Sequence, residues 1–187
     1  MTKTIQTKQL TKAVRSTKRW LLSLSPQSEE EQAYVDFGCS LTECATSRLP
    51  LPHAFPISNS TVLPDPCNLI SMGRDALIEL SRTYTGGTTR KNDCDLAVEQ
   101  LALSFARSDD LQVVAAMLRL ASSLGANSNV TSDAWRYLLA QQQEDGSFGL
   151  LSAELILLKQ QDRYMLVRLA VTVEVLWALA AYLSIER

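Results

Sequence analysis

The 187-residue chain has only seven glycines and one histidine, and aromatic side chains make up 6% of it. No apolar run reaches about 18 residues, so we expect no membrane-spanning helix. The apolar run "WLLSL" near the basic N-terminus is too short for a secretory signal. A chain of this length does not need a disulfide framework, so we expect its four cysteines to be reduced thiols in a cytoplasmic protein.

Acidic residues are absent from positions 1–28, although the net charge of the whole chain is −2. A basic arm of this kind can contact nucleic acid, an anionic membrane or an acidic peptide, or it can simply be a solvated helix face. No helix-turn-helix pattern accompanies it, so we expect no nucleic-acid partner. The cations are Lys3, Lys8, Lys12, Arg15, Lys18 and Arg19, and the first carboxylates follow as a run at Glu29, Glu30 and Glu31.

Apolar residues recur at helical spacing, and no stretch alternates as a strand would. Segment 48–67 holds five of the six prolines, which exclude a helix interior or a central strand. The sequence therefore predicts a single all-α domain over 1–187: a helical pair at 1–47, a Pro-rich loop at 48–67 and helical repeats at 68–187. The expected helices are 4–24, one that starts after Ser28, 68–84, 93–106, 109–124, 133–143, 150–160 and 163–185.

Helix ends are marked by capping residues. Glu31 completes a capping box with Ser28, and Gly125 is expected to end its helix in the left-handed conformation. The expected N-caps are Ser28, Ser108 and either Thr131 or Ser132.

The stretch "QQQEDGSFGL" at 141–150 places two glycines around a phenylalanine. Gly146 can adopt a left-handed conformation, and Asp145 can bond the backbone of the turn. Ser147 can cap the next helical segment. Phe148 is the single large apolar group and should tuck inward between helices, which predicts a tight corner between an outer and an inner helix.

The spacing Gln142-x-x-Asp145-Gly146-Ser147-Phe148 resembles the QxxDGSW repeat of α/α-toroid proteins, with Phe in place of Trp. These proteins include terpene cyclases, prenyltransferase β subunits and lanthionine cyclases. "TSDAWRYLLAQQQEDGSFG" resembles an outer helix and its turn, and "LAVTVEVLWALAAYL" at 169–183 resembles the following inner helix. The resemblance covers roughly 92–183. It implies antiparallel helical hairpins in a partial or minimal α/α toroid, with the Gln side chain capping a neighbouring helix.

Two carboxylates stand out within apolar helical stretches: Glu174 in "VTVEVLWAL" and Glu99 in "DLAVEQLAL". A carboxyl group buried in apolar surroundings is suited to general acid or base catalysis. Arg168 and Tyr164 are the candidate partners of Glu174, and the structural alternative is that Glu174 faces solvent. Asp95 would be the proton donor if Asp93-Cys94-Asp95-Leu96 acted as the DxDD motif of class II terpene cyclases. The fourth position departs from that motif, and a helix cap is the alternative.

Other chemistries have less support. Asp109-Asp110 lacks the last acid of a DDxxD motif, because Val113 stands there. A zinc ion would have to be bound by His53, Cys67 and Cys94. These residues do not show the spacing of zinc ligands, so we expect no metal and no cofactor. A nucleophilic cysteine in the Cys39–Cys44 region would need a base such as His53. The expected binding residues are Trp177, Phe148, His53 and Arg168.

Three functions remain open. The first is a small cyclase or tailoring protein of natural-product biosynthesis, which closes a ring in a lanthionine-type peptide by metal-independent acid-base catalysis through Glu174, Asp95 and Glu99. The second is a class II terpene-cyclase-like enzyme with Asp95 as the acid. The third is a non-catalytic helical module that binds a peptide or protein. An incomplete toroid leaves an apolar edge, which predicts a homodimer.

Overall fold

The computed structural model describes residues 2–47, 51, 78, 91–107, 109–125, 129–149 and 164–185; the side chains of 2–6 and 91–96 lie outside that description. Within these ranges the chain is helical, and its only β-type pairing is an isolated bridge between Gln142 and Phe148. The predicted all-α class is thus confirmed for this part of the chain. The helices are α1 (Thr2–Ser23), α2 (Glu29–Ser47), α4 (Lys91–Arg107), α5 (Leu111–Leu124), α6 (Asn129–Ala140) and α8 (Tyr164–Ile185).

Several predictions lie outside the described residues. They are the Pro-rich loop 48–67, where only Leu51 is described, the helix 68–84, where only Ile78 is described, and the helix 150–160.

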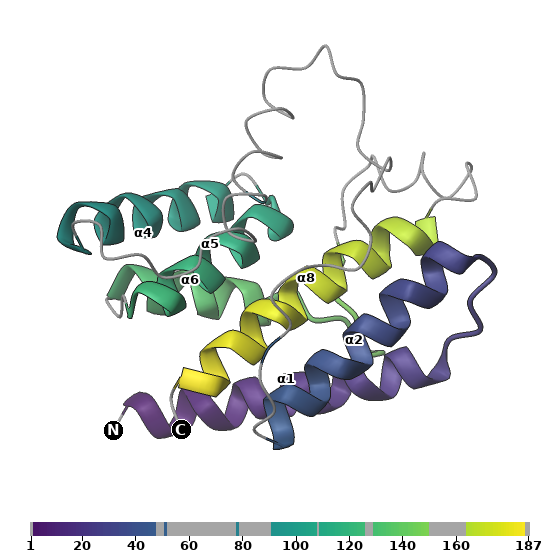
Figure 1. The fold of residues 1–187 in the computed structure, drawn as a ribbon. Coiled ribbons are helices and arrows are strands. Elements are labelled where there is room, and N and C mark those ends of the chain that lie inside the picture. The colour runs from purple at the N-terminus through teal and green to yellow at the C-terminus, as the bar shows by residue number, and fades with distance from the viewer. Residues whose placement is uncertain are drawn as a thin grey trace, which may run out of the picture.

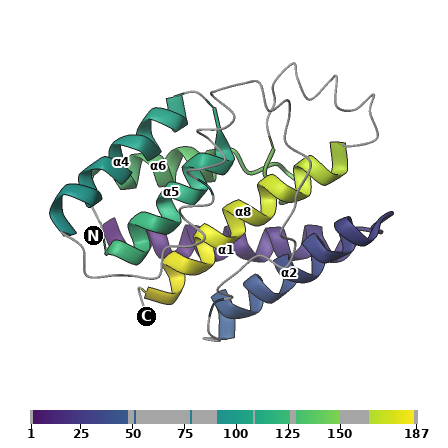
Figure 2. The same ribbon diagram turned by 45° about the horizontal axis from the view of Figure 1, so that its top comes forward.

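Helix α8 lies at the centre of the fold. It packs against α1 and α2 on one side and against α5 on the other, and α5 in turn packs against α4 and α6 (Figures 1 and 2). Every residue from Val171 to Ala181 is buried, as expected of a helix that is apolar on all sides. By length and composition α8 could also cross a membrane, but 72% of its apolar window is buried against the rest of the protein.

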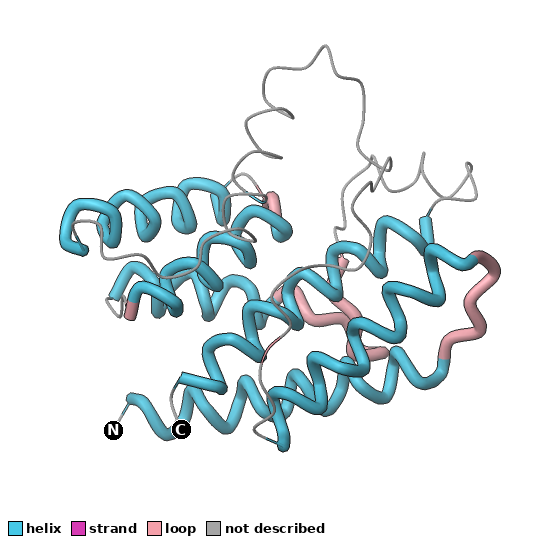
Figure 3. Tube along the Cα trace, viewed as in Figure 1, coloured by secondary structure: helices cyan, strands magenta, loops and turns pink. Residues whose placement is uncertain are grey.

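The first two helices form a hairpin. A five-residue connection, 24–28, joins α1 to α2, and Pro26 within it cannot continue α1 (Figure 3). The backbone N–H of Glu31 donates to Ser28 Oγ at 3.1 Å, so the predicted cap is confirmed. The Glu31 carboxylate completes the motif one residue early, because it accepts from the N–H of Gln27 at 2.6 Å and not from that of Ser28.

The predicted N-cap of α5 is wrong, and so is the predicted N-cap of α6. Helix α5 is capped by Asp110, whose carboxylate accepts from Val113 N at 3.2 Å, and not by Ser108. The preceding Asp109 adopts a positive φ of 58°, which aspartate tolerates better than most residues. The predicted C′ glycine, Gly125, is confirmed with φ 71°.

Helix α6 begins at Asn129, so Thr131 and Ser132 lie inside it and do not cap it. It ends at Ala140, three residues before the expected end at Gln143. The three glutamines after it belong to the corner at 141–149, which Figure 3 shows as a loop.

The corner is a tight hairpin loop. Gly146 N donates to Gln143 O at 2.9 Å, and Gln143 N donates to Ser147 O at 2.8 Å, which closes a three-residue loop with its last residue left-handed. Gly146 has the required positive φ, 98°. Asp145 Oδ1 accepts from the backbone N–H and the hydroxyl of Ser147 at 3.0 and 2.7 Å. The predicted roles of Gly146 and Asp145 are confirmed.

Hydrogen bonds fix the corner to α1 and α8. Thr17 Oγ1 on α1 donates to Gly146 O at 2.8 Å, and Gln142 Nε2 lies 3.0 Å from Ala13 O. Phe148 is fully buried, as predicted, and its backbone N–H and C=O both bond Thr172 Oγ1 on α8 at 3.0 Å. Two helices that are far apart in the sequence are therefore joined through one loop.

Replacing Gly146 by Ala should destabilise the protein by about 2–4 kcal/mol. The φ of 98° disfavours any side chain, and an added Cβ would lie 2.4 Å from the carbonyl oxygen of Ser16 on α1. Gly125→Ala is the matched control, because φ is also positive (71°) but nothing lies within 4 Å of the added Cβ. It should cost only about 1 kcal/mol. Urea unfolding measures both variants; equal losses would contradict the close approach of α1 to the corner.

Candidate functional site

Glu174 lies in the interior and forms an ion pair with Arg119 of α5. The two side chains are 3% and 5% exposed, and Arg119 Nη1 lies 2.9 Å from Glu174 Oε1. The prediction that Glu174 is buried is confirmed, and the solvent-facing alternative is wrong. Of its two candidate partners, Arg168 is wrong, because the guanidinium of Arg168 bonds the corner, and Tyr164 stays a prediction.

Aromatic rings cover this ion pair. The guanidinium carbon of Arg119 lies 3.8 Å from the ring centroid of Trp177, which is one turn after Glu174 on α8. The edge of Phe37 on α2 packs against Trp177, with the ring centroids 5.1 Å apart at 80°. Stacking on an aromatic face stabilises a cation. Burying an unpaired guanidinium would cost several kcal/mol, so Glu174 supplies the counter-charge that this core requires.

The other predicted acids do not join Glu174 in the described part of the chain. Glu99 is buried on α4, which packs against α5 and α6, whereas α8 packs against α1, α2 and α5. Asp95 belongs to the first turns of α4, but its side chain lies outside the described residues, as does the whole of His53.

Arg168 belongs to the corner. Its Nη2 lies 2.6 Å from Asp145 Oδ2 and also bonds Ser147 Oγ, and its guanidinium carbon is 5.4 Å from the ring of Trp20 on α1. Ser147 thus bonds Asp145 and Arg168, and the residues it was predicted to cap lie outside the described range. Partial burial raises the pKa of the Asp145 carboxyl. The hydrogen bonds from Ser147 and the charge of Arg168 outweigh this effect and hold the pKa below its usual range.

The cysteine chemistry gains no support. Burial raises the pKa of the Cys39 and Cys44 thiols, which disfavours the nucleophilic thiolate. Among the described residues no group of three His, Cys, Asp or Glu side chains is placed to hold a metal ion.

Sequence reasoning missed Arg119, the residue that pairs with Glu174. A signal for it exists, because Arg119 is the only charged residue of α5. A lone charge in an apolar helix calls for a buried counter-charge elsewhere. The position of that counter-charge, 55 residues further along, is set by helix packing and has no local signature.

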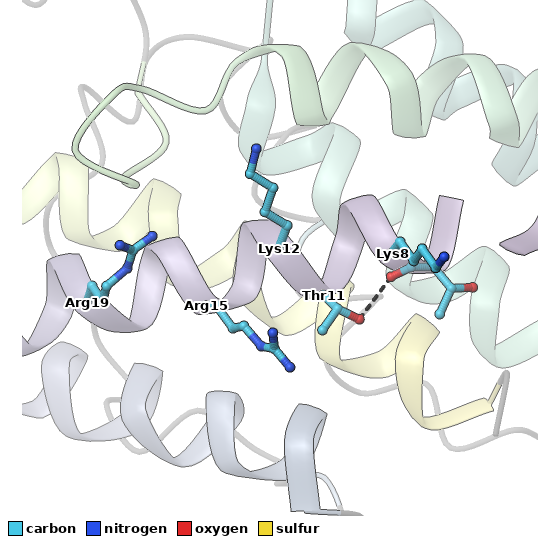
Figure 4. A pocket seen from close by; sticks show the side chains of 6 residues that line it. Lys8, Thr11, Lys12, Arg15 and Arg19 are labelled. Carbon is cyan, nitrogen blue, oxygen red and sulfur yellow. Dashed lines mark hydrogen bonds between the residues drawn. The ribbon is translucent and has the colours of Figure 1, made fainter. Parts of the chain in front are cut away.

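The outer face of α1 is cationic. Four exposed side chains follow one line along the helix at spacings of four, three and four residues, opposite its buried residues: Lys8, Lys12, Arg15 and Arg19. We call these four the cationic stripe. With Thr7 and Thr11 they line a shallow hollow of about 350 Å³, and Figure 4 shows Lys12, Arg15 and Arg19 projecting from the helix.

A second, smaller hollow of about 140 Å³ lies where α1 turns into α2 and meets the start of α8. Its walls include Leu24, Pro26 and Met165. Neither of these two hollows is lined by Glu174, Glu99, Trp177 or Phe148.

Comparisons of this chain with protein families, with characterised proteins and with solved structures found no match.

Removing one of the two charged side chains of the buried ion pair should destabilise the protein strongly. Glu174→Leu leaves Arg119 buried without its counter-charge and should cost about 3–5 kcal/mol. The double variant Arg119→Met/Glu174→Leu replaces both charges by apolar groups and should recover most of that loss. Chemical unfolding of the two single variants and the double variant gives the coupling. Strictly additive losses would show that the two side chains do not act as a pair.

Proposed function

We propose that this chain is a non-catalytic helical interaction module of α/α-toroid type, acting in the cytoplasm, which binds an acidic segment of a peptide or protein through the cationic stripe. The observation that carries the proposal is the stripe itself. Four exposed cations stand in line on one helix, in a segment without any acid, whereas the buried Arg119 is paired with Glu174. Such a face steers an anionic partner toward it.

Two observations support the toroid part of this proposal. The Gln142–Phe148 corner, on whose residues the resemblance rests, has a buried aromatic side chain and a hydrogen-bonded Asp–Gly–Ser turn. The Gln142 side chain also reaches a neighbouring helix, although it bonds the middle of α1 at Ala13. In addition, the two most buried helices, α5 and α8, pack side by side.

Binding is favoured over interior chemistry because of how Glu174 is held. A general acid or base must reach the proton that it transfers. Glu174 is 3% exposed, its charge is met by Arg119, and neither described hollow reaches it. The cations of the exposed stripe, in contrast, can be reached by a partner from solvent.

An acidic protein segment fits the stripe better than a membrane or a nucleic acid does. A helix that lies on a membrane needs a free apolar face, but the apolar side of α1 is buried in the core at Leu10, Val14 and Leu21. Proteins that track single-stranded nucleic acid add stacking aromatics to their cations, and the stripe has none. The net charge of −2 also disfavours a dense polyanion.

A labelled oligoglutamate peptide should bind the protein at low salt and be released as salt rises. Lys12→Glu/Arg15→Glu should weaken this binding at least tenfold. The control Arg107→Glu/Arg136→Glu changes the net charge equally at exposed sites on α4 and α6 and should leave binding unchanged. Fluorescence anisotropy provides the measurement. Equal losses in the two variants, or tighter binding to oligonucleotides or anionic vesicles than to oligoglutamate, would reject an acidic protein partner.

A peptide cyclase is the second candidate, because Glu174 is a carboxyl group buried in apolar surroundings beside Trp177, a setting suited to general acid or base catalysis. The terpene-cyclase alternative depends on Asp95, whose side chain lies outside the described residues.

Incubation with a peptide that carries one dehydroalanine and one cysteine separates the two candidates. Ring closure adds the S–H across the C=C bond, so the peptide mass is unchanged and one alkylatable thiol disappears. We expect no acceleration by the protein. Thiol loss that is faster with the wild type than with Glu174→Gln, at a temperature where circular dichroism shows both to be folded, would instead establish the cyclase.

A further inference from the structure

The outer face of α2 carries charges of the opposite sign. Glu29, Asp36 and Glu43 are exposed and recur every seven residues, which places them near one line along the helix. They lie opposite the buried side of α2, which includes Tyr34, Gly38 and Leu41. We call these three carboxylates the acidic stripe.

The two stripes match in height along the hairpin. The connection begins after Ser23, the last residue of α1, and ends before Glu29, the first residue of α2, so positions along both helices can be counted from it. At a rise of 1.5 Å per residue, Arg15 lies about 12 Å and Lys8 about 22 Å from that end. On α2, Asp36 lies about 10 Å and Glu43 about 21 Å from it. Two of the cations therefore lie about as far along α1 from the connection as two of the carboxylates lie along α2.

Within one chain the two stripes do not neutralise each other. Each lies on the side of its helix that is opposite to the buried residues, so both point to solvent. In the part of the chain that the structure describes, the ion pairs are Arg119–Glu174, Arg136–Asp133 and Arg168–Asp145, and none involves a stripe residue.

We infer that the two stripes form a self-complementary interface, in which the cationic stripe of one copy binds the acidic stripe on α2 of a second copy. The inference rests on the proposed function, because it names one acidic partner for the same face of α1. Arginine pairs well with carboxylates, and Arg15 faces Asp36 at matching height. Because each copy carries both stripes, a two-fold axis along the hairpin would form each cation–carboxylate contact twice.

This association is weak and depends on salt. Exposed ion pairs contribute little individually and are screened by ions in solution, so the interface responds to concentration and ionic strength. Sedimentation equilibrium should show self-association at about 0.1 M salt, where the Debye length is roughly 10 Å, and monomers at about 1 M, where it is roughly 3 Å.

Charge reversal tests the pairing of the stripes. Lys8→Glu/Arg15→Glu places carboxylates where Glu43 and Asp36 of the other copy would meet cations, and Asp36→Lys/Glu43→Lys places cations opposite Arg15 and Lys8. Each variant alone should associate at least tenfold more weakly than the wild type, since like charges then face each other. An equimolar mixture of the two restores opposite charges and should associate again. The control Arg107→Glu/Arg136→Glu should associate as the wild type does, and circular dichroism verifies that all variants are folded.

The inference is overturned if the wild type stays monomeric at about 0.1 M salt, if both reversed variants still associate, or if mixing them restores nothing. The oligoglutamate assay separates its failure from that of the proposed function. A wild type that binds oligoglutamate but does not associate with itself rejects the second copy alone. A wild type that does neither rejects the acidic partner as well.

Discussion

The burial of α8 from Val171 to Ala181 is the constraint that determines the arrangement of the other helices. A helix that is apolar around its whole circumference must be covered on every side. The hairpin α1–α2 covers one side, α5 covers another, and the corner closes over Thr172 through Phe148. Helices α4 and α6 then cover α5, which is itself buried from Val113 to Ser122. The fold thus consists of two buried helices and the elements that keep water from them.

The charged groups inside this fold obey the same constraint. Arg119 and Glu174 lie on the two buried helices and face each other where those helices meet. Neither charge could remain there alone, so each fixes the position of the other. Apolar packing allows helices to slide or rotate, whereas an ion pair under Trp177 has one satisfactory arrangement. We therefore expect the pair to favour one register between α5 and α8, since setting register is the best attested use of buried charge.

Local features were predictable from the sequence, and contacts between distant segments were not. The Ser28 cap, the left-handed Gly125 and the inward Phe148 each depend on a few neighbouring residues. The start of α5 was misjudged because Ser108 and Asp110 are both good caps, and only the path of the chain decides between them. The hydrogen bonds that join Gln142 to α1 and Thr17 to the corner have no periodic signature in the sequence. The sequence shows that Arg119 is a lone charge in an apolar helix, but not which residue pairs with it. It also shows the cations of α1, but not what they bind.

The bond between Thr17 and Gly146 spans 129 positions of the chain, which affects the order of events during synthesis. At translation rates of about 5–20 residues per second, the corner emerges roughly 6–26 s after the segment of α1 that it holds. Until then neither the corner nor α8 is available to α1, and its apolar side can pack only against α2. Helix α1 thus waits for partners that are synthesised after it, and a growing chain exposes Leu10, Val14 and Leu21 to chaperones throughout that interval.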